Sequence, residues 1–305
     1  MENSRITLGT VQLGLDYGVN NLLGKPGLKK SLEILDFAYK NKVYFLDTAF
    51  SYGDAEEIIG RFVRSRTIDK PLKVTSKLKP NIFSERLLDK NKYKIIRWEI
   101  EKSLAKMNLE YLDGYLLHSP QYIYDKEVVS ALKKCKKEGL IKNFGVSIYD
   151  EKDALYAVTE AKVDYIQIPY SVFDQRLART DFFKLARLKN VRVFARSAFL
   201  QGLVFMKDKD IPSHLKMAKS YLKKFDKIIL KYGFSRAQAA LLFSLSNCDI
   251  DQVVIGVDNL SQLKEDLDIA KSDIDFKNCR DELVSEFRYM KDSIIFPSLW
   301  SKNKK

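Results

Sequence analysis

The stretch VYFLDTAFSYGDAEEIIG, residues 43–60, contains an apolar strand, a turn and the start of a helix. Asp47 ends the strand, and Tyr52 lies in the turn. Two further strand-like runs end in polar residues, with Lys77 in VTSKL and His118 in GYLLH. In barrels built of such strand–helix units, the chemistry collects at the carboxyl ends of the strands. We therefore expect these four side chains to lie at one end of a sheet.

These four residue types are those that the reduction of a carbonyl group needs. A tyrosine hydroxyl can donate a proton to a carbonyl oxygen. The ammonium of Lys77 is expected to lower the pKa of Tyr52, and the carboxylate of Asp47 is expected to hold that ammonium in place. Taken singly, Asp47 fits a helix cap and Lys77 a solvated strand end. Their order along the chain favours a catalytic set.

Short β-branched or aromatic runs alternate with longer amphipathic segments along the chain. Residues 28–41 and 93–108 have apolar residues at helical spacing. Eight strands, each followed by a helix, predict a single-domain α/β fold, the (β/α)8 TIM barrel, over residues 1–305, with a C-terminal helix and tail from about residue 279. A doubly wound sheet is the alternative, but LGTVQLGLDYG lacks the GxGxxG turn. The expected strands are residues 6–11, 43–47, 72–76, 113–117, 141–147, 164–168, 191–195 and 251–256.

The composition is that of a folded, basic protein, with 46% hydrophobic residues and a formal net charge of +13. The lysines are dispersed over helix-like segments such as residues 133–139 and 219–227, so we interpret the charge as a solvated surface rather than a nucleic-acid site. The three cysteines lack CxxC spacing, so neither a disulfide nor a metal site is expected. No apolar run matches a membrane span or a signal peptide. A cytoplasmic protein without a membrane partner is expected.

Ordered motifs extend beyond the four polar residues. Between residues 6 and 270 the chain contains LGTVQLG, DTAFSYGDAEEIIG, VTSKL, LDGYLLH, GVSIYD, QIPYSVFD, ARSAFLQG and IGVDNLSQLKEDL. With these motifs the chain resembles the aldo-keto reductase family. The resemblance implies a monomeric barrel that reduces a small-molecule aldehyde or ketone, with sugar derivatives among the candidates, at the expense of NADPH or NADH. It implies Tyr52 as the general acid, Lys77 and Asp47 as the pair that adjusts the pKa of Tyr52, and His118 as a hydrogen-bond donor that orients the carbonyl group.

The resemblance also implies which residues surround the cofactor. Ser147 and Gln167 match positions that hold the nicotinamide carboxamide, and Gly9 and Thr10 match the turn after the first strand. The loop around the pyrophosphate would contain Ser197, Phe199, Gln201 and Gly202. The adenosine end would be formed by Gly256, Asp258, Gln262, Glu265 and Asp266.

Several positions depart from the family pattern. Arg196 stands where an aromatic residue commonly stacks on the nicotinamide, so we expect it to alter redox preference or to bind an acidic substrate. Ile148 replaces the asparagine that commonly follows the serine. Gly256 and Gln262 replace two cations that many NADP-selective relatives place around the 2′-phosphate, which weakens the case for strict NADP selectivity. The nearby Lys264 keeps the expectation on NADPH over NADH.

Three other functions remain open from the sequence. Lys77 could form a Schiff base in a lyase, the barrel could be a regulatory protein that binds nicotinamide with little turnover, and the basic surface could serve nucleic acid. Near the C-terminus, Phe296 and Trp300 either close over the substrate or pack against the barrel. Glu56 is expected to orient the turn that carries Tyr52, and His214 is expected on the surface.

Overall fold

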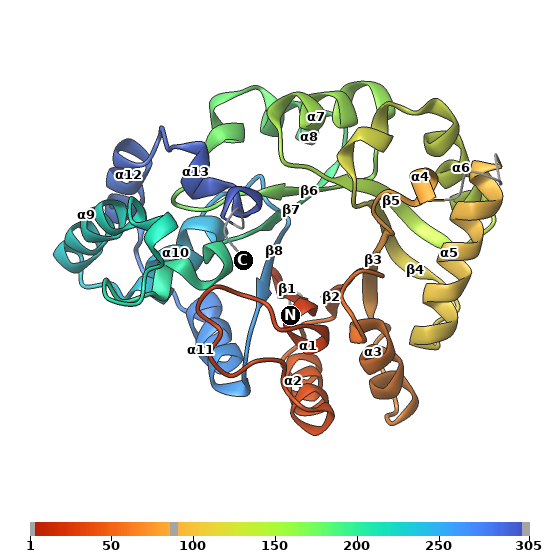
Figure 1. Ribbon diagram of the computed structural model, residues 1–305, viewed down its shortest axis with the longest axis horizontal. Helices are drawn as coiled ribbons and strands as arrows, with labels where there is room; N and C mark the ends of the chain where they lie inside the picture. Colours follow the sequence, from red (N-terminus) through yellow and green to blue (C-terminus); the bar gives the residue numbers. More distant parts are fainter. Residues whose placement is uncertain (1–3, 86–90, 301–305) are drawn as a thin grey trace.

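The computed structural model describes residues 4–85 and 91–300, and within them eight parallel strands close into a barrel (Figure 1). Each strand pairs with the next along the chain, and the last pairs with the first. The predicted (β/α)8 fold is confirmed. The expected domain also includes residues 1–3, 86–90 and 301–305, which lie outside the described residues. The strands are β1 (Ile6–Gly9), β2 (Phe45–Asp47), β3 (Lys73–Leu78), β4 (Leu112–Leu117), β5 (Ile141–Ser147), β6 (Tyr165–Pro169), β7 (Arg192–Arg196) and β8 (Gln252–Gly256).

Helices follow the strands and surround the barrel (Figure 1). The two segments with helical spacing form α2 (Leu28–Lys40) and α5 (Lys92–Met107). The others are α1 (Val11–Gly14), α3 (Ala55–Arg64), α4 (Ile82–Glu85), α6 (Lys126–Lys137), α7 (Glu151–Tyr156), α8 (Phe182–Leu188), α9 (Ala218–Lys231), α10 (Arg236–Leu245), α11 (Leu260–Lys271), α12 (Lys277–Glu286) and α13 (Asp292–Ile295). Short 3₁₀ segments are η1 (Pro120–Tyr124), η3 (Arg176–Arg179), η4 (Leu200–Phe205), η5 (Ser213–Leu215) and η6 (Pro297–Leu299), and η2 (Ala157–Ala161) is a π-helical turn.

The first strand is shorter than predicted, and the difference shapes the barrel mouth. The chain leaves β1 after Gly9, and both the backbone N–H and the hydroxyl of Thr10 donate to the carbonyl oxygen of Asp47, at 2.9 and 3.0 Å. Val11 then starts α1 instead of extending the strand. The turn after β1 is therefore tied to the end of β2, where Asp47 lies.

The opposite end of the barrel is filled by side chains. Phe45, Leu116, Tyr165 and Phe194 form a separate buried cluster inside it. The Tyr165 hydroxyl donates to Asp113 Oδ2 at 2.7 Å and accepts from Arg192 Nη1 at 3.1 Å. This end is thus closed by packing and hydrogen bonds.

The lysine-rich helical segments present their charges to solvent, as the sequence suggested. In α6, Lys133 and Lys137 are exposed while Cys135 between them is buried. His214 is exposed as well. Among the helices of residues 4–85 and 91–300, none combines the length and apolar character needed to cross a bilayer.

Candidate active site

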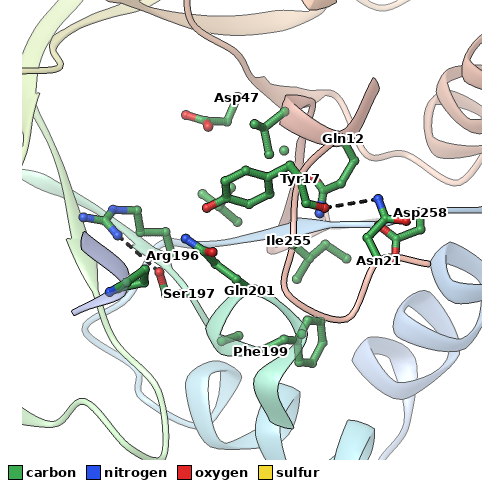
Figure 2. Close-up of a pocket in the computed structure, with 18 of the residues that line it drawn as sticks. Gln12, Tyr17, Asn21, Asp47, Arg196, Ser197, Phe199, Gln201, Ile255 and Asp258 are labelled. Atoms are coloured by element: carbon green, nitrogen blue, oxygen red, sulfur yellow. Dashed lines mark hydrogen bonds between the residues drawn. The ribbon is translucent and has the colours of Figure 1, made fainter. Parts of the chain in front are cut away.

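A cavity of about 600 Å³ opens beyond the carboxyl ends of the strands (Figure 2). Its volume lies within the range of small-molecule and cofactor sites, roughly 300–1,000 Å³. Lys77 is buried behind Asp47, and every other residue that the sequence predicted for the site lines this cavity. Those lining residues are Asp47, Tyr52, His118, Gly9, Thr10, Ser147, Gln167, Arg196, Ser197, Phe199, Gln201, Gly202, Gly256, Asp258, Gln262, Glu265 and Asp266.

Lys77 is held by three oxygen acceptors at the end of β3. Its Nζ donates to both carboxylate oxygens of Asp47, at 2.7 and 2.8 Å, and to the carbonyl oxygen of Thr48 at 2.9 Å. Burial lowers the pKa of Lys77, and the Asp47 carboxylate opposes that decrease. The lysine side chain is only 1% exposed, and its three donors are all engaged. This geometry disfavours a Schiff base on Lys77, because Nζ has no open approach.

Tyr52 is the residue for which the sequence-based expectation was wrong. The Lys77 ammonium does lie near its hydroxyl, at 3.4 Å. However, burial raises the pKa of Tyr52, and the Asp47 carboxylate raises it further, with Arg196 opposing. The reason is that the ammonium is already paired with Asp47, so its charge does not offset the effects of burial and of the carboxylate on the phenol. The hydroxyl therefore stays protonated at neutral pH, which is the state that a proton donor needs.

His118 lines the cavity beside Tyr52 and is electrically neutral. Its pKa is lowered to about 3 by burial, with Lys77 and Arg196 adding to the decrease. Its Nδ1 lies 3.2 Å from the hydroxyl oxygen of Ser51. When Nδ1 accepts from that hydroxyl, the neutral ring donates through Nε2. Its ring meets that of Tyr52 edge-on, with 6.0 Å between centroids.

Two glycines bring the turn that carries Tyr52 against the turn after β1. A Cβ added to Gly14 would lie 1.8 Å from the carbonyl oxygen of Tyr52, and one added to Gly53 would lie 2.3 Å from the carbonyl oxygen of Gly14. Gly53 also has a φ of +58°, in the left-handed region that glycine adopts most easily. These contacts hold the backbone of Tyr52 in place. Gly14 is part of the LGTVQLG motif, but its contact with Tyr52 was not foreseen.

Ser147 and Gln167 extend the hydrogen-bond network of the lysine pair. Gln167 Nε2 donates to Asp47 Oδ1 at 2.7 Å, and the Ser147 hydroxyl donates to Gln167 Oε1 at 3.2 Å. Both side chains are buried, Ser147 as the last residue of β5 and Gln167 beside it on the neighbouring strand β6. Ser147 and Gln167 therefore lie where a planar amide of a ligand could contact them. Gln167 also orients the Asp47 carboxylate.

The two ends of the cavity differ in charge. Arg196 lies on one side of the view in Figure 2 and Asp258 on the other. Around Asp258, the lining includes Glu265 and Asp266 from α11. Burial and the neighbouring Glu265 raise the pKa of Asp266 to about 8. Burial also raises the pKa of Asp258, while a hydrogen bond from Gln262 opposes the increase.

Part of the cavity wall comes from residues for which no role was predicted. Tyr17, Asn20 and Asn21 line it from the long connection between β1 and α2. This connection reaches the loop after β7, because the N–H of Val19 donates to the carbonyl oxygen of Gln201 at 2.9 Å. Burial raises the pKa of Tyr17 to about 12, and Tyr52 contributes to the increase.

The C-terminal segment lines the cavity with small residues and not with its aromatic rings. Pro297 and Ser298 line the cavity. Trp300 is buried, and its Nε1 donates to the carbonyl oxygen of Ser293 at 3.1 Å. The ring of Phe296 lies 4.3 Å from the guanidinium carbon of Arg176. Both aromatic side chains pack against the protein, which was the second of the two alternatives.

Glu56 connects the helix after the Tyr52 turn to its neighbours. It is buried in α3 and accepts a hydrogen bond from the Ser76 hydroxyl at 2.7 Å. Lys106 Nζ lies 3.5 Å from its other oxygen. These contacts join the start of α3 to β3, the strand that carries Lys77.

Comparisons with known proteins identify the family of the chain. Residues 5–281 match the model of the Aldo/keto reductase family. The uncharacterized oxidoreductase YqkF of Bacillus subtilis is 25% identical over 285 residues, which cover 89% of each chain. The NADH-specific methylglyoxal reductase of Escherichia coli is 25% identical over 217 residues, 66% of this chain and 65% of that protein. The holo form of the aldo-keto reductase AKR11C1 from Bacillus halodurans has the same fold, with a TM-score of 0.75 and 18% identity over 98% of this chain and 96% of that chain.

Proposed function

The chain belongs to the aldo/keto reductase family, and from this premise we propose that it reduces an aldehyde or ketone to an alcohol with a reduced nicotinamide dinucleotide. The observation that carries the proposal is the placement of Tyr52. Its hydroxyl has a ligand-sized cavity on one side and the buried Lys77–Asp47 pair on the other. A protonated phenol in this position is a proton donor for a group bound in the cavity.

In this proposal, Tyr52 and His118 act on the carbonyl oxygen. When bound, the reduced nicotinamide supplies a hydride to the carbonyl carbon. Tyr52 gives its hydroxyl proton to the oxygen, so the carbonyl group becomes an alcohol and the phenol becomes a phenolate. Lys77 stabilises that phenolate from 3.4 Å until water restores the proton. The neutral His118 ring donates a hydrogen bond to the same oxygen and stabilises the charge that develops on it.

The cavity has the polar groups that a dinucleotide would need. Gln12 Oε1 is buried in the cavity lining and has no hydrogen-bond partner among the described residues. A buried acceptor of this kind is usually satisfied, and a ligand N–H or O–H would do so. Ser147 and Gln167 would hold the nicotinamide carboxamide, and Ser197 and Gln201 would face the pyrophosphate.

We further infer that the cofactor is NADH, against the preference for NADPH drawn from the sequence. Asp258 and Glu265 supply two carboxyl groups to the lining of the cavity, while Asp266, with its pKa raised to about 8, is mostly protonated at neutral pH. Lys264 is not among the lining residues, and its Nζ lies 5.6 Å from the centre of the Phe37 ring. A 2′-phosphate would therefore meet acidic groups where it needs cations. The name of the NADH-specific relative is consistent with this inference.

Two measurements test the proposed function. Carbonyl-dependent oxidation of NADH and NADPH should be followed by nicotinamide absorbance over a panel of aldehydes and ketones. Dissociation constants of both cofactors should be measured by fluorescence titration. We expect turnover, and binding of NADH at least about tenfold tighter, which corresponds to 1.4 kcal/mol. Cofactor binding with no turnover over the whole panel would instead support the regulatory function.

A further inference from the structure

Arg196 is a cation at the reaction end of the cavity that the proposed proton transfer does not use. It ends β7 and lines the cavity beside Tyr149, with 4.5 Å between its guanidinium carbon and the centre of the tyrosine ring. Nη2 donates to the carbonyl oxygen of Ile148 at 2.9 Å, and Nη1 donates to the Ser197 hydroxyl at 3.2 Å. A guanidinium carries five N–H groups in one plane. These contacts fix that plane and leave further donors for a ligand.

No carboxylate pairs with Arg196 within residues 4–85 and 91–300. Two arginines near the barrel do have such a partner. Arg176 contacts Asp174 at 2.8 Å, and Arg236 contacts Asp226 at 2.5 Å. The interactions of Arg196 are with neutral groups only, so its charge is not compensated by the part of the protein that the structure describes.

The surroundings of Arg196 do not cancel its charge either. Lys77 and Asp47 neutralise each other, and the pKa of His118, lowered to about 3, keeps that ring neutral. The charge of Arg196 lowers the pKa of both Tyr52 and His118. At Tyr52 it opposes the effect of burial, and at His118 it adds to that effect. Of the other acidic residues in the lining, Asp258 lies opposite Arg196 in Figure 2, and Glu265 and Asp266 belong to α11, the helix that follows Asp258. The reaction end is therefore electropositive.

We propose that the substrate carries an anionic group, a carboxylate or a phosphate, that pairs with Arg196 while its carbonyl group contacts Tyr52 and His118. The proposal rests on the proposed reductase function and adds the class of substrate. An arginine whose plane is fixed by other contacts suits two parallel hydrogen bonds to an oxyanion. Because the pair forms in a partly buried cavity, it should contribute more than a surface ion pair.

The test compares aldehydes that carry an anionic group with neutral counterparts. One pair is 4-carboxybenzaldehyde and its neutral carboxamide. The second pair is glyceraldehyde 3-phosphate and glyceraldehyde, which distinguishes a phosphate from a carboxylate. We expect kcat/KM of the wild-type enzyme to be at least about tenfold higher for the anionic member of one pair, mainly through a lower KM. Equal values within both pairs would overturn the inference and leave the reductase function standing.

Variants then assign the preference to Arg196. In Arg196→Gln the anionic-to-neutral ratio of kcat/KM should fall to about one, and Arg196→Lys should recover part of it. Arg187→Gln is the matched control, because Arg187 is 69% exposed on α8 and pairs with Asp249. It removes the same charge outside the cavity and should leave the ratio unchanged. A ratio that persists in Arg196→Gln, or that falls equally in Arg187→Gln, would contradict the proposal.

Direct binding separates this inference from the proposed function. Calorimetry with the enzyme loaded with oxidised cofactor should show 4-carboxybenzaldehyde binding more tightly than its carboxamide, and the difference should disappear in Arg196→Gln. If the wild type reduces none of these aldehydes and no member of the wider panel, the reductase proposal fails, and binding of the charged and neutral aldehydes still decides the role of Arg196. If Arg196→Gln changes only the dissociation constant of NADH, the arginine serves the cofactor and the inference is wrong.

Discussion

Two clusters at opposite ends of the barrel are built from the same kinds of side chain. At the closed end, Tyr165 contacts the acid Asp113 and the base Arg192. At the open end, Tyr52 lies 3.4 Å from Lys77, which is paired with Asp47. Burial raises the pKa of both tyrosines, and a neighbouring carboxylate adds to the increase in each case. Residue type and pKa direction therefore do not distinguish the two.

What distinguishes them is the use of the hydroxyl proton. Tyr165 donates it to Asp113 at 2.7 Å, so a protein carboxylate has taken the position that a substrate would need. At Tyr52 the acid is bound to the lysine, and the side of the hydroxyl that faces the cavity is left for a ligand. The comparison teaches that a tyrosine, an acid and a base become a proton-donating site only when the proton has no acceptor within the protein.

The largest effect should come from removing each hydroxyl in turn. Tyr52→Phe should lower kcat by about 10²–10⁴, because the proton donor is lost, while the dissociation constant of NADH stays within about threefold. Tyr165→Phe should keep most of the activity but lose about 1–3 kcal/mol of unfolding free energy, because Asp113 and Arg192 lose a buried partner. Steady-state kinetics and urea unfolding of both variants check this. Near-normal turnover in Tyr52→Phe would refute its assigned role.

Replacement of Lys77 should lower the free energy of unfolding more than replacement of Arg192. Lys77→Met leaves the buried Asp47 carboxylate unpaired, and we expect a loss of about 3–5 kcal/mol of unfolding free energy, together with loss of activity. Arg192→Met acts at a partly buried residue whose contacts are the Tyr165 hydroxyl and two aromatic rings, so it should cost less, about 1–2 kcal/mol. Urea unfolding measures both. An Arg192 variant that loses more stability than the Lys77 variant would reverse the comparison.

A smaller effect should follow from moving Tyr52 without changing it. In Gly14→Ala the new Cβ would meet the carbonyl oxygen of Tyr52, so the turn has to shift. A displacement of about 1 Å can lower turnover by about 10², and we expect a decrease of tenfold or more in kcat. The matched control is Gly27→Ala, where a Cβ would have no neighbour within 4 Å. Equal kcat in the two variants would show that Gly14 does not position Tyr52.

Local patterns were sufficient to predict the elements and the residues of the open end. The eight strands follow from their β-branched and aromatic runs, and α10 begins where the Ser235 hydroxyl accepts a hydrogen bond from the N–H of Gln238 at 3.1 Å. Asp47, Tyr52, Lys77 and His118 were placed together because parallel strands share one carboxyl end. These features depend on neighbours in the chain or on the topology alone.

The remaining features depend on contacts that a sequence does not contain. The role of Tyr17 and Asn21 in the cavity wall was missed, because their loop has no periodicity and is placed by long-range contacts, such as the hydrogen bond from the N–H of Val19 to the loop after β7. The predicted direction of the pKa shift of Tyr52 was wrong, because the prediction did not include the pairing of Lys77 with both oxygens of Asp47. The contrast with Tyr165 was equally hidden, since the chain has sixteen tyrosines.

The smallest expected effect is a nearly flat dependence of kcat on pH. His118, with its pKa lowered to about 3, is neutral above about pH 4, and Tyr52, with its pKa above the ordinary value, is protonated throughout the range from about pH 5 to 8. Neither group changes charge in that interval, so kcat for reduction at saturating NADH should vary by less than about threefold. Had Lys77 lowered the pKa of Tyr52, the protonated donor would be lost as the pH rises towards neutrality, and kcat would fall.

The pKa of Asp266, which lines the cavity, is raised to about 8, so any change near that pH should appear in the KM for NADH and not in kcat. Steady-state kinetics from pH 5 to 9, with Asp266→Asn as the control, separate titration of the proton donor from titration of Asp266. If kcat falls in both proteins as the pH rises from 5 to 8, the proton donor titrates as the sequence alone suggested.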